Sequence, residues 1–270
     1  MKKDDKPGRK PGAKQDVRSG AKQDVRPGAK QIPIRINKYL SQQGVCSRRE
    51  ADRLVERGAI LVNGQRALVG QEITAADEIL LNGNRIAEAK KEIFLAVNKP
   101  RGVVVTTDSR WDDKTLEAVV NYPSRVFAVG RLDKESEGLI LMTNNGDISN
   151  LIQKSKENHE KEYIVTVDRK ITKEFILGMS DGVYLKELDQ TTKKCRVKKL
   201  DHYSFDIILT EGLNRQIRRM CEVFDYKVRR LKRIRVMNIE LGNLPAGAYR
   251  ELAGGEIREL KKLVKGQRDQ

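Results

Sequence analysis

Residues 130–139, which read GRLDKESEGL, contain the residue types best suited to chemistry in this chain. They lie between two apolar runs that predict strands, and their glycines bracket a tight excursion that would present Asp133 and Arg131 at a sheet edge. Because Arg131 and Lys134 are close by, Asp133 is expected to stay ionised, as a nucleophile or an electrostatic stabiliser must. The same spacing fits an ordinary loop in which Asp133 caps a turn. The stretch alone therefore leaves catalysis and a structural turn both open.

Residues 211–236 form a second candidate, because they combine a predicted helix with a dense run of cations. The apolar stripe of the helix consists of Ile217, Met220, Cys221 and Phe224. Asn214 fits its N-cap, and guanidinium groups at a helix N-terminus form a phosphate site. Residues 228–236 (VRRLKRIRV) then interleave cations with aliphatic side chains. This density favours contact with RNA or phosphate over a merely solvated basic surface.

The charge of the chain indicates a polyanionic partner. Its 270 residues include 54 Lys and Arg against 38 Asp and Glu, a formal net charge of +16. Nucleic acid is the commonest polyanion that proteins bind, and an anionic membrane surface is the second candidate. The apolar runs are far too short to cross a bilayer, and the first residues lack the apolar core of a secretory signal. We therefore expect a cytoplasmic protein that binds nucleic acid and no membrane.

Several classes of site lack the residues they need. Three scattered Cys and two His predict neither a disulfide framework nor a zinc site, so no metal is expected. A P-loop, a Rossmann glycine fingerprint and a Ser-His-Asp arrangement are absent from the sequence. No second acidic residue stands out as the acid partner of Asp133 that glycoside hydrolysis would need.

The chain divides into five segments. Residues 1–33 repeat GAKQDVR with a period of eight and almost no apolar residue, which predicts a disordered basic tail. The other segments are a compact unit (34–82), a polar linker (83–92), the main domain (93–254) and a charged C-terminal tail with a short helix (255–270). Within the main domain, strands are predicted at 93–97, 103–107, 126–129, 139–143, 163–167, 195–199 and 205–209, and helices around 115–121, 147–153, 172–179 and 214–224. This pattern predicts an α+β fold with a mostly antiparallel sheet.

The compact unit 34–82 is predicted to hold two helices and a hairpin. Ser47 to Glu50 read as a capping box that opens the second helix, and Asn63-Gly64 is a strong hairpin turn. Five basic side chains gather in the helix pair: Arg35, Lys38, Arg48, Arg49 and Arg53. They predict an RNA-binding face, and the alternative is a solvated charged face that neighbouring carboxylates neutralise.

Together, these segments resemble the RsuA/RluB/RluE/RluF family of ribosomal RNA pseudouridine synthases over about residues 34–252, and they are most similar to the RluF type. GRLDKESEGL resembles the catalytic motif of the family, and residues 98–102, 161–165 and 212–220 resemble its first, tyrosine and third motifs. Residues 34–82 resemble an S-four-like (αL) RNA-binding domain. Asp225 stands where the family would have Gly. The resemblance implies a pseudouridine synthase fold with a mixed, mostly antiparallel sheet and flanking helices.

The resemblance also implies a reaction. A uridine is isomerised without a cofactor: its glycosidic bond to nitrogen is cut, the base turns over, and a bond to carbon 5 forms. Catalytic roles would fall to Asp133, which attacks the ribose or the base, to Tyr163, which stacks on the uracil and helps remove the carbon-5 proton, and to Arg218, which pairs with Asp133. Arg131 would fill the gap that the flipped uridine leaves.

The remaining motif positions would bind RNA. Contacts with the substrate are expected from Lys99, Asn214, Arg215, Gln216, Arg219 and Ile217, the last as an apolar wall. Further RNA contacts are expected from Arg230 and Arg233 and from the five basic residues of the compact unit.

Three functions stay open on the sequence. The first is a pseudouridine synthase that acts on 23S (large-subunit) ribosomal RNA as a monomer. The second is the same chemistry on small-subunit ribosomal RNA or on a tRNA anticodon stem-loop. The third is a non-catalytic RNA-binding factor in ribosome assembly, against which the presence of Asp133, Tyr163 and Arg218 argues.

Deleting residues 1–33 removes ten basic and four acidic residues from the chain. We expect the affinity for RNA to fall modestly and its salt dependence to flatten, because fewer counterions are then released on binding. Equilibrium binding over a series of salt concentrations checks this. An unchanged slope would contradict an electrostatic role of the tail.

Overall fold

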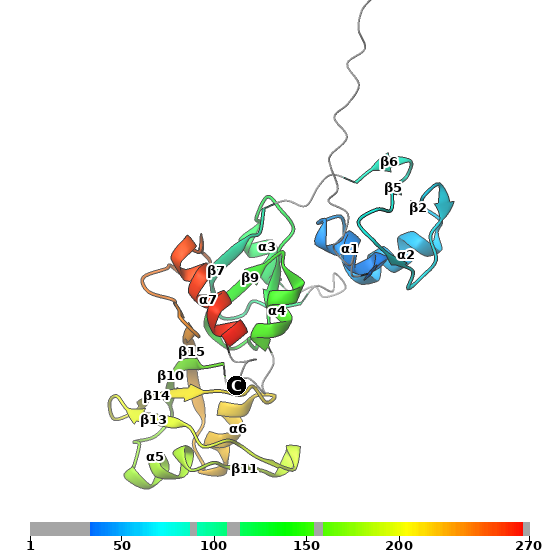
Figure 1. The fold of residues 1–270 in the computed structure, drawn as a ribbon. Helices are drawn as coiled ribbons and strands as arrows, with labels where there is room; N and C mark the ends of the chain where they lie inside the picture. The colour runs from blue at the N-terminus through cyan, green and yellow to red at the C-terminus, as the bar shows by residue number, and fades with distance from the viewer. Residues whose placement is uncertain (1–32, 87–90, 107–113, 154–158, 267–270) are drawn as a thin grey trace, which may run out of the picture.

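The computed structural model describes residues 33–86, 91–106, 114–153 and 159–266 (Figure 1). The predicted tail lies outside this part of the chain except for Pro33, as do residues 87–90 of the predicted linker. Among the described residues, no helix is both long and apolar enough to cross a membrane.

The N-terminal unit packs two short helices on small antiparallel sheets. Its elements are β1 (Ile34–Arg35), α1 (Ile36–Gln42), α2 (Arg48–Glu56), β2 (Ile60–Val62), β3 (Gln65–Arg66), β4 (Glu72–Ile73), β5 (Ile79–Leu81) and β6 (Asn84–Arg85). The four-stranded sheet has the order β3-β2-β5-β6, and β1 pairs with β4. Its core includes Ile36, Leu40, Ala51 and Ile60, each with no exposed surface.

The N-cap and the hairpin turn predicted for this unit are confirmed, but the capping box is only half formed. The Ser47 hydroxyl accepts a hydrogen bond from the Glu50 N–H at 3.2 Å, as the predicted N-cap requires. The Glu50 carboxylate does not reach back to complete the capping box but binds Arg53 and Arg57. Asn63 and Gly64 both have positive φ and join β2 to β3, as a tight hairpin turn needs.

The main domain is built on one mixed sheet. Its nine described strands are β7 (Phe94–Lys99), β8 (Phe127–Val129), β9 (Glu137–Thr143), β10 (Lys161–Val167), β13 (Arg196–Lys199), β14 (Ser204–Leu209), β15 (Val228–Val236), β16 (Ile239–Glu240) and β17 (Tyr249–Glu251). The order is β13-β14-β10-β15-β9-β7-β17, with β16 beside β15 and β8 beside β9. Among the described pairings of this sheet only β15 and β9 are parallel, so the predicted mostly antiparallel α+β fold is confirmed.

Helices cover both faces of this sheet (Figure 1). They are α3 (Leu116–Val120), α4 (Gly146–Gln153), α5 (Lys173–Ser180), α6 (Gln216–Val223) and α7 (Gly254–Gly266); a short hairpin of β11 (Tyr184–Leu185) and β12 (Gln190–Thr191) encloses the 3-10 turn Lys186–Leu188. Along β9, Ile140 and Met142 join one core cluster with α3, α5 and α6, whereas Leu139 and Leu141 join another with α4 and α7. A strand buried on both faces explains the continuous apolar run at this point of the sequence.

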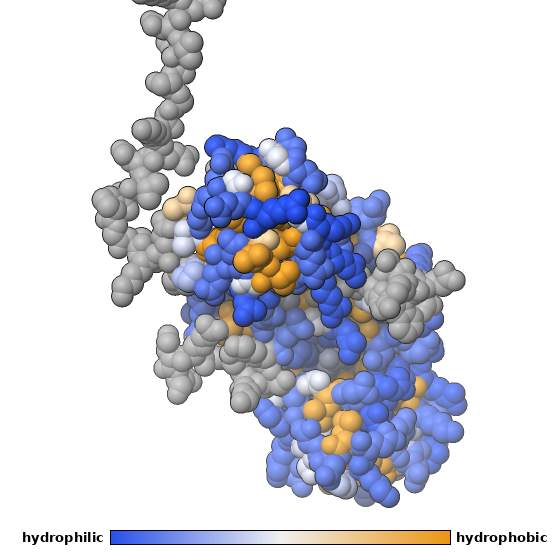
Figure 2. All heavy atoms as spheres, turned by 90° about the vertical axis from the view of Figure 1, so that its right-hand side faces the viewer, coloured by the Kyte–Doolittle hydropathy of each residue, from blue (hydrophilic) through white to orange (hydrophobic). Residues whose placement is uncertain are grey.

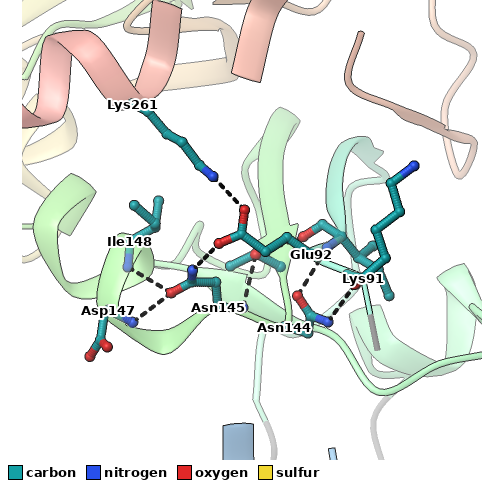
Figure 3. A network of polar contacts seen from close by, with 9 residues as sticks. Lys91, Glu92, Asn144, Asn145, Asp147, Ile148 and Lys261 are labelled. Carbon is teal, nitrogen blue, oxygen red and sulfur yellow. Dashed lines mark hydrogen bonds and ion pairs between the residues drawn. The ribbon is translucent and has the colours of Figure 1, made fainter. Parts of the chain in front are cut away.

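Figure 3 shows how the start of α4 is tied to the rest of the main domain. The Asn145 side-chain oxygen accepts from the N–H groups of Asp147 and Ile148, which satisfies the helix N-terminus. The amide nitrogen of Asn145 donates to Glu92 at 2.6 Å, and Glu92 is also ion-paired with Lys261 of α7. The N-terminus of α4 is thereby linked to the chain before β7 and to the last helix.

Two expectations about local structure are wrong. Residues 103–106 make one isolated bridge, Val104 to Thr115, instead of a strand. Arg215, with φ 51°, is the N-cap of α6 in place of Asn214. The helix expected in the charged C-terminal tail is present as α7, but it is docked on the main domain, because Leu260 and Val264 are fully buried in the core. Residues 228–236, for which no element was predicted, form the nine-residue strand β15.

Asp225 adopts a backbone conformation that favours glycine. Its φ is 61°, in the left-handed region. This explains why the family resemblance leads one to expect Gly there, since Asp is among the few other residues that tolerate this region.

Gly138 lets β15 lie against β9. A Cβ at this position would overlap the carbonyl oxygen of Arg233 and lie only 2.8 Å from its nitrogen, and φ is 102°. Gly138 and Arg233 are register partners in the parallel pairing. The absence of a side chain is therefore what allows the two strands to approach.

Gly138→Ala should lower the free energy of unfolding by about 3 kcal/mol or more, because an unfavourable φ and a backbone clash add up. Denaturant unfolding measures this. Gly255→Ala is the control, since a Cβ there meets only the end of the Arg258 side chain at 4.0 Å and alanine favours the helix. Equal stabilities of the two variants would refute the role of Gly138.

Candidate active site

The loop that carries Asp133 is anchored from beneath by Lys99, the last residue of β7. The Lys99 ammonium donates to the carbonyls of Pro100, Lys134 and Ser136 at 2.9, 3.3 and 2.7 Å. The side chain has no exposed surface, and burial lowers the pKa of Lys99 to about 8. The structure gives no support to the predicted contact of Lys99 with substrate, because the buried ammonium is directed at these three carbonyls. Lys99 ties the backbone that follows Asp133, at Lys134 and Ser136, to Pro100 at the end of β7.

A cavity of about 350 Å³ opens beside this loop and is large enough for a nucleobase. Its walls come from the Asp133 loop, the end of α4, strands β10 and β15, and the segment that leads into α6. The sequence-predicted residues that line it are Arg131, Asp133, Tyr163, Asn214, Arg215, Gln216, Ile217 and Arg233. Asp133 and Tyr163, which lie 30 positions apart in the sequence, therefore face one space.

Tyr163 belongs to the buried face of β10. Only 9% of its surface is exposed, and it alternates with outward-facing neighbours along the strand. A flat ring at the wall of a cavity of this size can stack on a planar base. Ile217, at the start of α6, supplies an apolar surface to the same cavity.

Arg218 lies near Asp133 but does not bind it directly. Its guanidinium donates to the carbonyls of Val228 at 3.3 Å and Glu135 at 3.4 Å, and no ion pair within 4 Å joins it to Asp133 in the described part of the chain. Burial and the neighbouring Arg215 lower the pKa of Arg218, whereas the charge of Asp133 raises it. The predicted direct pair is replaced by attraction at longer range.

The segment before α6 is held by its own side chains. Gln216 is 4% exposed; its oxygen accepts from the Leu213 N–H, and its nitrogen donates to Glu211 at 2.8 Å. Arg219 donates to Asn214 and is ion-paired with Glu187, and it is not among the residues that line the cavity. Direct contact of Arg219 with substrate is therefore not supported. Arg219 closes the turn that presents Asn214 and Arg215.

A second cavity, of about 560 Å³, lies between the N-terminal unit and the main domain. Lys38 and Arg48 line it from the first side, and Arg125 and Arg131 from the second. It shares Arg131 with the first cavity, so the two hollows adjoin. The units are also joined directly, since Asp147 at the start of α4 is ion-paired with Lys38 at 2.7 Å.

The other predicted RNA-binding residues are dispersed. Arg35 and Arg49 are exposed, and Arg53 is exposed but ion-paired with Glu50. Arg230 is exposed and paired with Glu137. Figure 2 looks onto the N-terminal unit and shows a mainly hydrophilic surface with small apolar patches. Arg233 is only 4% exposed and lines the cavity beside the Asp133 loop, so the RNA contact predicted for it would lie inside that cavity and not on the outer surface.

Sequence reasoning missed Lys161 and Arg125. Lys161 lines the first cavity, and the period of two along a strand, which puts it on the face of Tyr163, could have revealed it. Arg125 lies over the ring of Phe127 at 5.6 Å and lines the second cavity; no local pattern marks it.

Comparisons with known proteins agree with this fold. The family model for RNA pseudouridylate synthase matches residues 93–223, and the S4 domain model matches residues 34–79. Dual-specificity RNA pseudouridine synthase RluF of Salmonella typhi is 49% identical over 234 residues, which cover 86% of this chain and 80% of that protein. Ribosomal large subunit pseudouridine synthase B of Bacillus subtilis is 32% identical over 239 residues, covering 85% and 96%. A crystal structure of a pseudouridylate synthase superposes with a TM-score of 0.63 at 27% identity, covering 84% of this chain and 99% of that one.

Lys99→Met should lower both stability and turnover, since three carbonyls that frame the Asp133 loop lose a charged donor. The expected loss of unfolding free energy is about 2–4 kcal/mol, the range for buried partners of a charged group. Denaturant unfolding and single-turnover kinetics measure the two effects. If Lys99→Met left the free energy of unfolding unchanged and weakened RNA affinity, Lys99 would instead be a substrate-binding residue.

Proposed function

The chain belongs to the RNA pseudouridine synthase family and is an isomerase that acts on RNA; we propose that its target is a specific uridine of large-subunit ribosomal RNA, which it isomerises without a cofactor. We propose further that Asp133 is the essential carboxylate and that Tyr163 stacks on the uracil. The observation that supports these roles is that both side chains line one cavity that is large enough for a nucleobase. The sequence segments 34–82 and 93–254 would then serve as the RNA-binding and catalytic domains.

The reaction rearranges one nucleotide without net gain or loss of atoms. The bond from uracil N1 to the ribose is cut, a bond from C5 to the same carbon is formed, the proton on C5 is released, and N1 becomes protonated. Asp133 attacks the ribose or the base, and Arg218 lies near it. Tyr163 and Ile217 hold the ring between an aromatic and an apolar surface.

The uridine must leave its stack before it can enter the cavity, which costs a few kcal/mol. Arg131 is exposed at the border of both cavities and is suited to fill the gap in the RNA. The cations Lys38, Arg48 and Arg125 line the adjoining hollow, so the flanking RNA would run between the two units. Their contacts with phosphate offset the cost of flipping.

A second RNA target is supported by a separate observation. The Salmonella typhi and Escherichia coli relatives are named dual-specificity enzymes, which favours a second RNA target for this chain as well. A tRNA anticodon stem-loop or small-subunit ribosomal RNA would be that target, with the same chemistry. We also propose that the enzyme works as a monomer in the cytoplasm.

Asp133→Asn should abolish turnover, by at least about 10⁴-fold, because an amide cannot act as the nucleophile, while RNA affinity persists. Asp181→Asn is the control: Asp181 is exposed, and among the described residues its one ion pair is with the exposed Lys194. Pseudouridine in total RNA would be mapped in cells that lack the gene and carry the wild type or either variant. A large-subunit uridine restored by the wild type and the control, but not by Asp133→Asn, supports the proposal.

Two results would change the proposed function. Loss of modification only at a tRNA or small-subunit uridine would move the target and keep the chemistry. Full modification with Asp133→Asn would remove Asp133 from the catalytic role.

A further inference from the structure

Two cations in the reaction cavity, Lys161 and Arg233, have no role in the chemistry described so far. We propose that they form an anion site that takes the negative charge which the uracil ring acquires during isomerisation. This rests on the proposed function and deepens it, since it assigns an electrostatic partner to the base.

The strand register brings both cations to Tyr163. Lys161 precedes Tyr163 by two positions on β10, so their side chains share a face of the sheet. Arg233 of β15 is the register partner of Tyr163. All three line the 350 Å³ cavity.

An irregularity in β15 separates Arg233 from Arg235. Two residues that are two positions apart on a regular strand would share a face. The register shifts between Glu162 and Tyr163, so Arg233 is opposite Tyr163 while Arg235 is opposite Glu162. Arg235 is ion-paired there with Glu160 and Glu162, at 3.0 and 2.5 Å. The bulge thus sends one arginine into the cavity and the other to a carboxylate cluster on the opposite face.

The two inward cations lack such carboxylates. In the described part of the chain, the contacts of the Lys161 ammonium and the Arg233 guanidinium are with backbone carbonyls: His159 at 3.4 Å and Leu139 at 2.6 Å. Burial, and then the charge of Arg233, lower the pKa of Lys161 to about 8. Holding two like charges close together in a buried site is unfavourable for folding. Such unfavourable arrangements of charge are typical of functional sites.

The other charged or titratable groups that line the cavity are Arg131, Asp133, Tyr163, Glu211 and Arg215. Glu211 is occupied by the Gln216 amide and the Lys193 N–H. Asp133 forms no ion pair within 4 Å with either cation among the described residues. Lys161 and Arg233 therefore face the space that the base would enter with their charge available.

The chemistry places negative charge on the ring whichever carbon Asp133 attacks. If Asp133 displaces the base from the ribose, the electron pair of the N1–C1′ bond stays on uracil and spreads to its carbonyl oxygens. If Asp133 adds to C6, the electron pair of the C5–C6 double bond moves to C5 and the C4 carbonyl oxygen. In both cases a cation fixed near those oxygens stabilises the anion before C5 bonds to C1′.

Burial favours the base over a phosphate as the anion. Arg233 is 4% exposed, and Lys161 lies on the face of the proposed stacking ring. The exposed cations that border the cavity, Arg131 and Arg215, are better placed for the backbone. If Lys161 or Arg233 contacted a phosphate, its loss would weaken RNA binding and leave the chemical step unchanged. This difference distinguishes the base from a phosphate by experiment.

The first experiment compares Lys161→Met and Arg233→Met with Arg235→Met, a change of the same kind on the opposite face of β15. Total RNA from cells lacking the gene is the substrate, because it contains the unmodified uridine whatever its location. We expect the single-turnover rate at saturating enzyme to fall about 100-fold or more in the first two variants, the range for loss of one fixed donor, with RNA affinity within twofold of the wild type. Arg235→Met should keep the rate.

Stability separates this role from a structural one. Methionine fills the space of Lys161 without a buried charge, so Lys161→Met should melt at the same temperature as the wild type or higher. A structural lysine would instead give a less stable protein whose rate falls only through unfolding.

The pH dependence of the rate provides a second check. If the charge of Lys161 is needed, the single-turnover rate falls as pH rises through about 8, where the ammonium loses its proton. Lys161→Arg should restore most of the rate and move this fall to higher pH. Lys99 also has a pKa of about 8, but it is present in both the wild type and Lys161→Arg. The difference between their pH profiles therefore reports on Lys161.

Each other outcome decides against the anion site. Wild-type rates in Lys161→Met and Arg233→Met overturn it and leave the proposed function intact. Weaker RNA binding with an unchanged saturated rate assigns the pair to a phosphate. If the wild type itself converts no uridine in this RNA, the proposed function fails and the anion site fails with it.

Discussion

The parallel contact between β9 and β15 is the constraint on which the rest of the main domain depends. One half of the sheet is the antiparallel group β13-β14-β10-β15, and the other is β9 with β7, β8 and β17. Two residue pairs join them, Glu137 with Lys232 and Gly138 with Arg233. Because Gly138 has no side chain, the backbones can meet there. The junction sets the Asp133 loop, just before β9, beside Tyr163 on β10, the neighbour of β15.

Two buried lysines near this junction differ in what their charges contact. Lys99 and Lys161 are both buried enough to lower their pKa to about 8. Lys99 has three carbonyl acceptors, so its charge is used to hold the loop. Lys161 has one long contact and a cation as neighbour, so its charge faces the cavity. Partners, rather than residue type or burial, separate a structural cation from one available to substrate.

The N-terminal unit is joined to the proposed reaction cavity through α4. The N-terminus of this helix is capped by Asn145, tied to α7 through Glu92, and paired with Lys38 through Asp147. The end of the same helix contributes Ile152 and Gln153 to that cavity. The positive charge is thus not spread evenly: many exposed arginines are paired with glutamates, while Arg48, Arg125 and Arg131 line the hollow between the units, together with Lys38, which is paired with Asp147.

Local patterns in the sequence determined most of the elements and the identity of the motifs. Alternating and helical periods, the Ser47 cap and the Asn63-Gly64 turn act over a few residues, and the structure has these features where they were predicted. Tertiary structure decided what surrounds Lys99, Arg219, Arg233 and Lys161. Whether a cation meets a carbonyl, a carboxylate or an open cavity depends on strand register, on one bulge and on one glycine contact between strands far apart in the sequence. Such long-range geometry follows from packing the whole chain, and no short window of residues contains it.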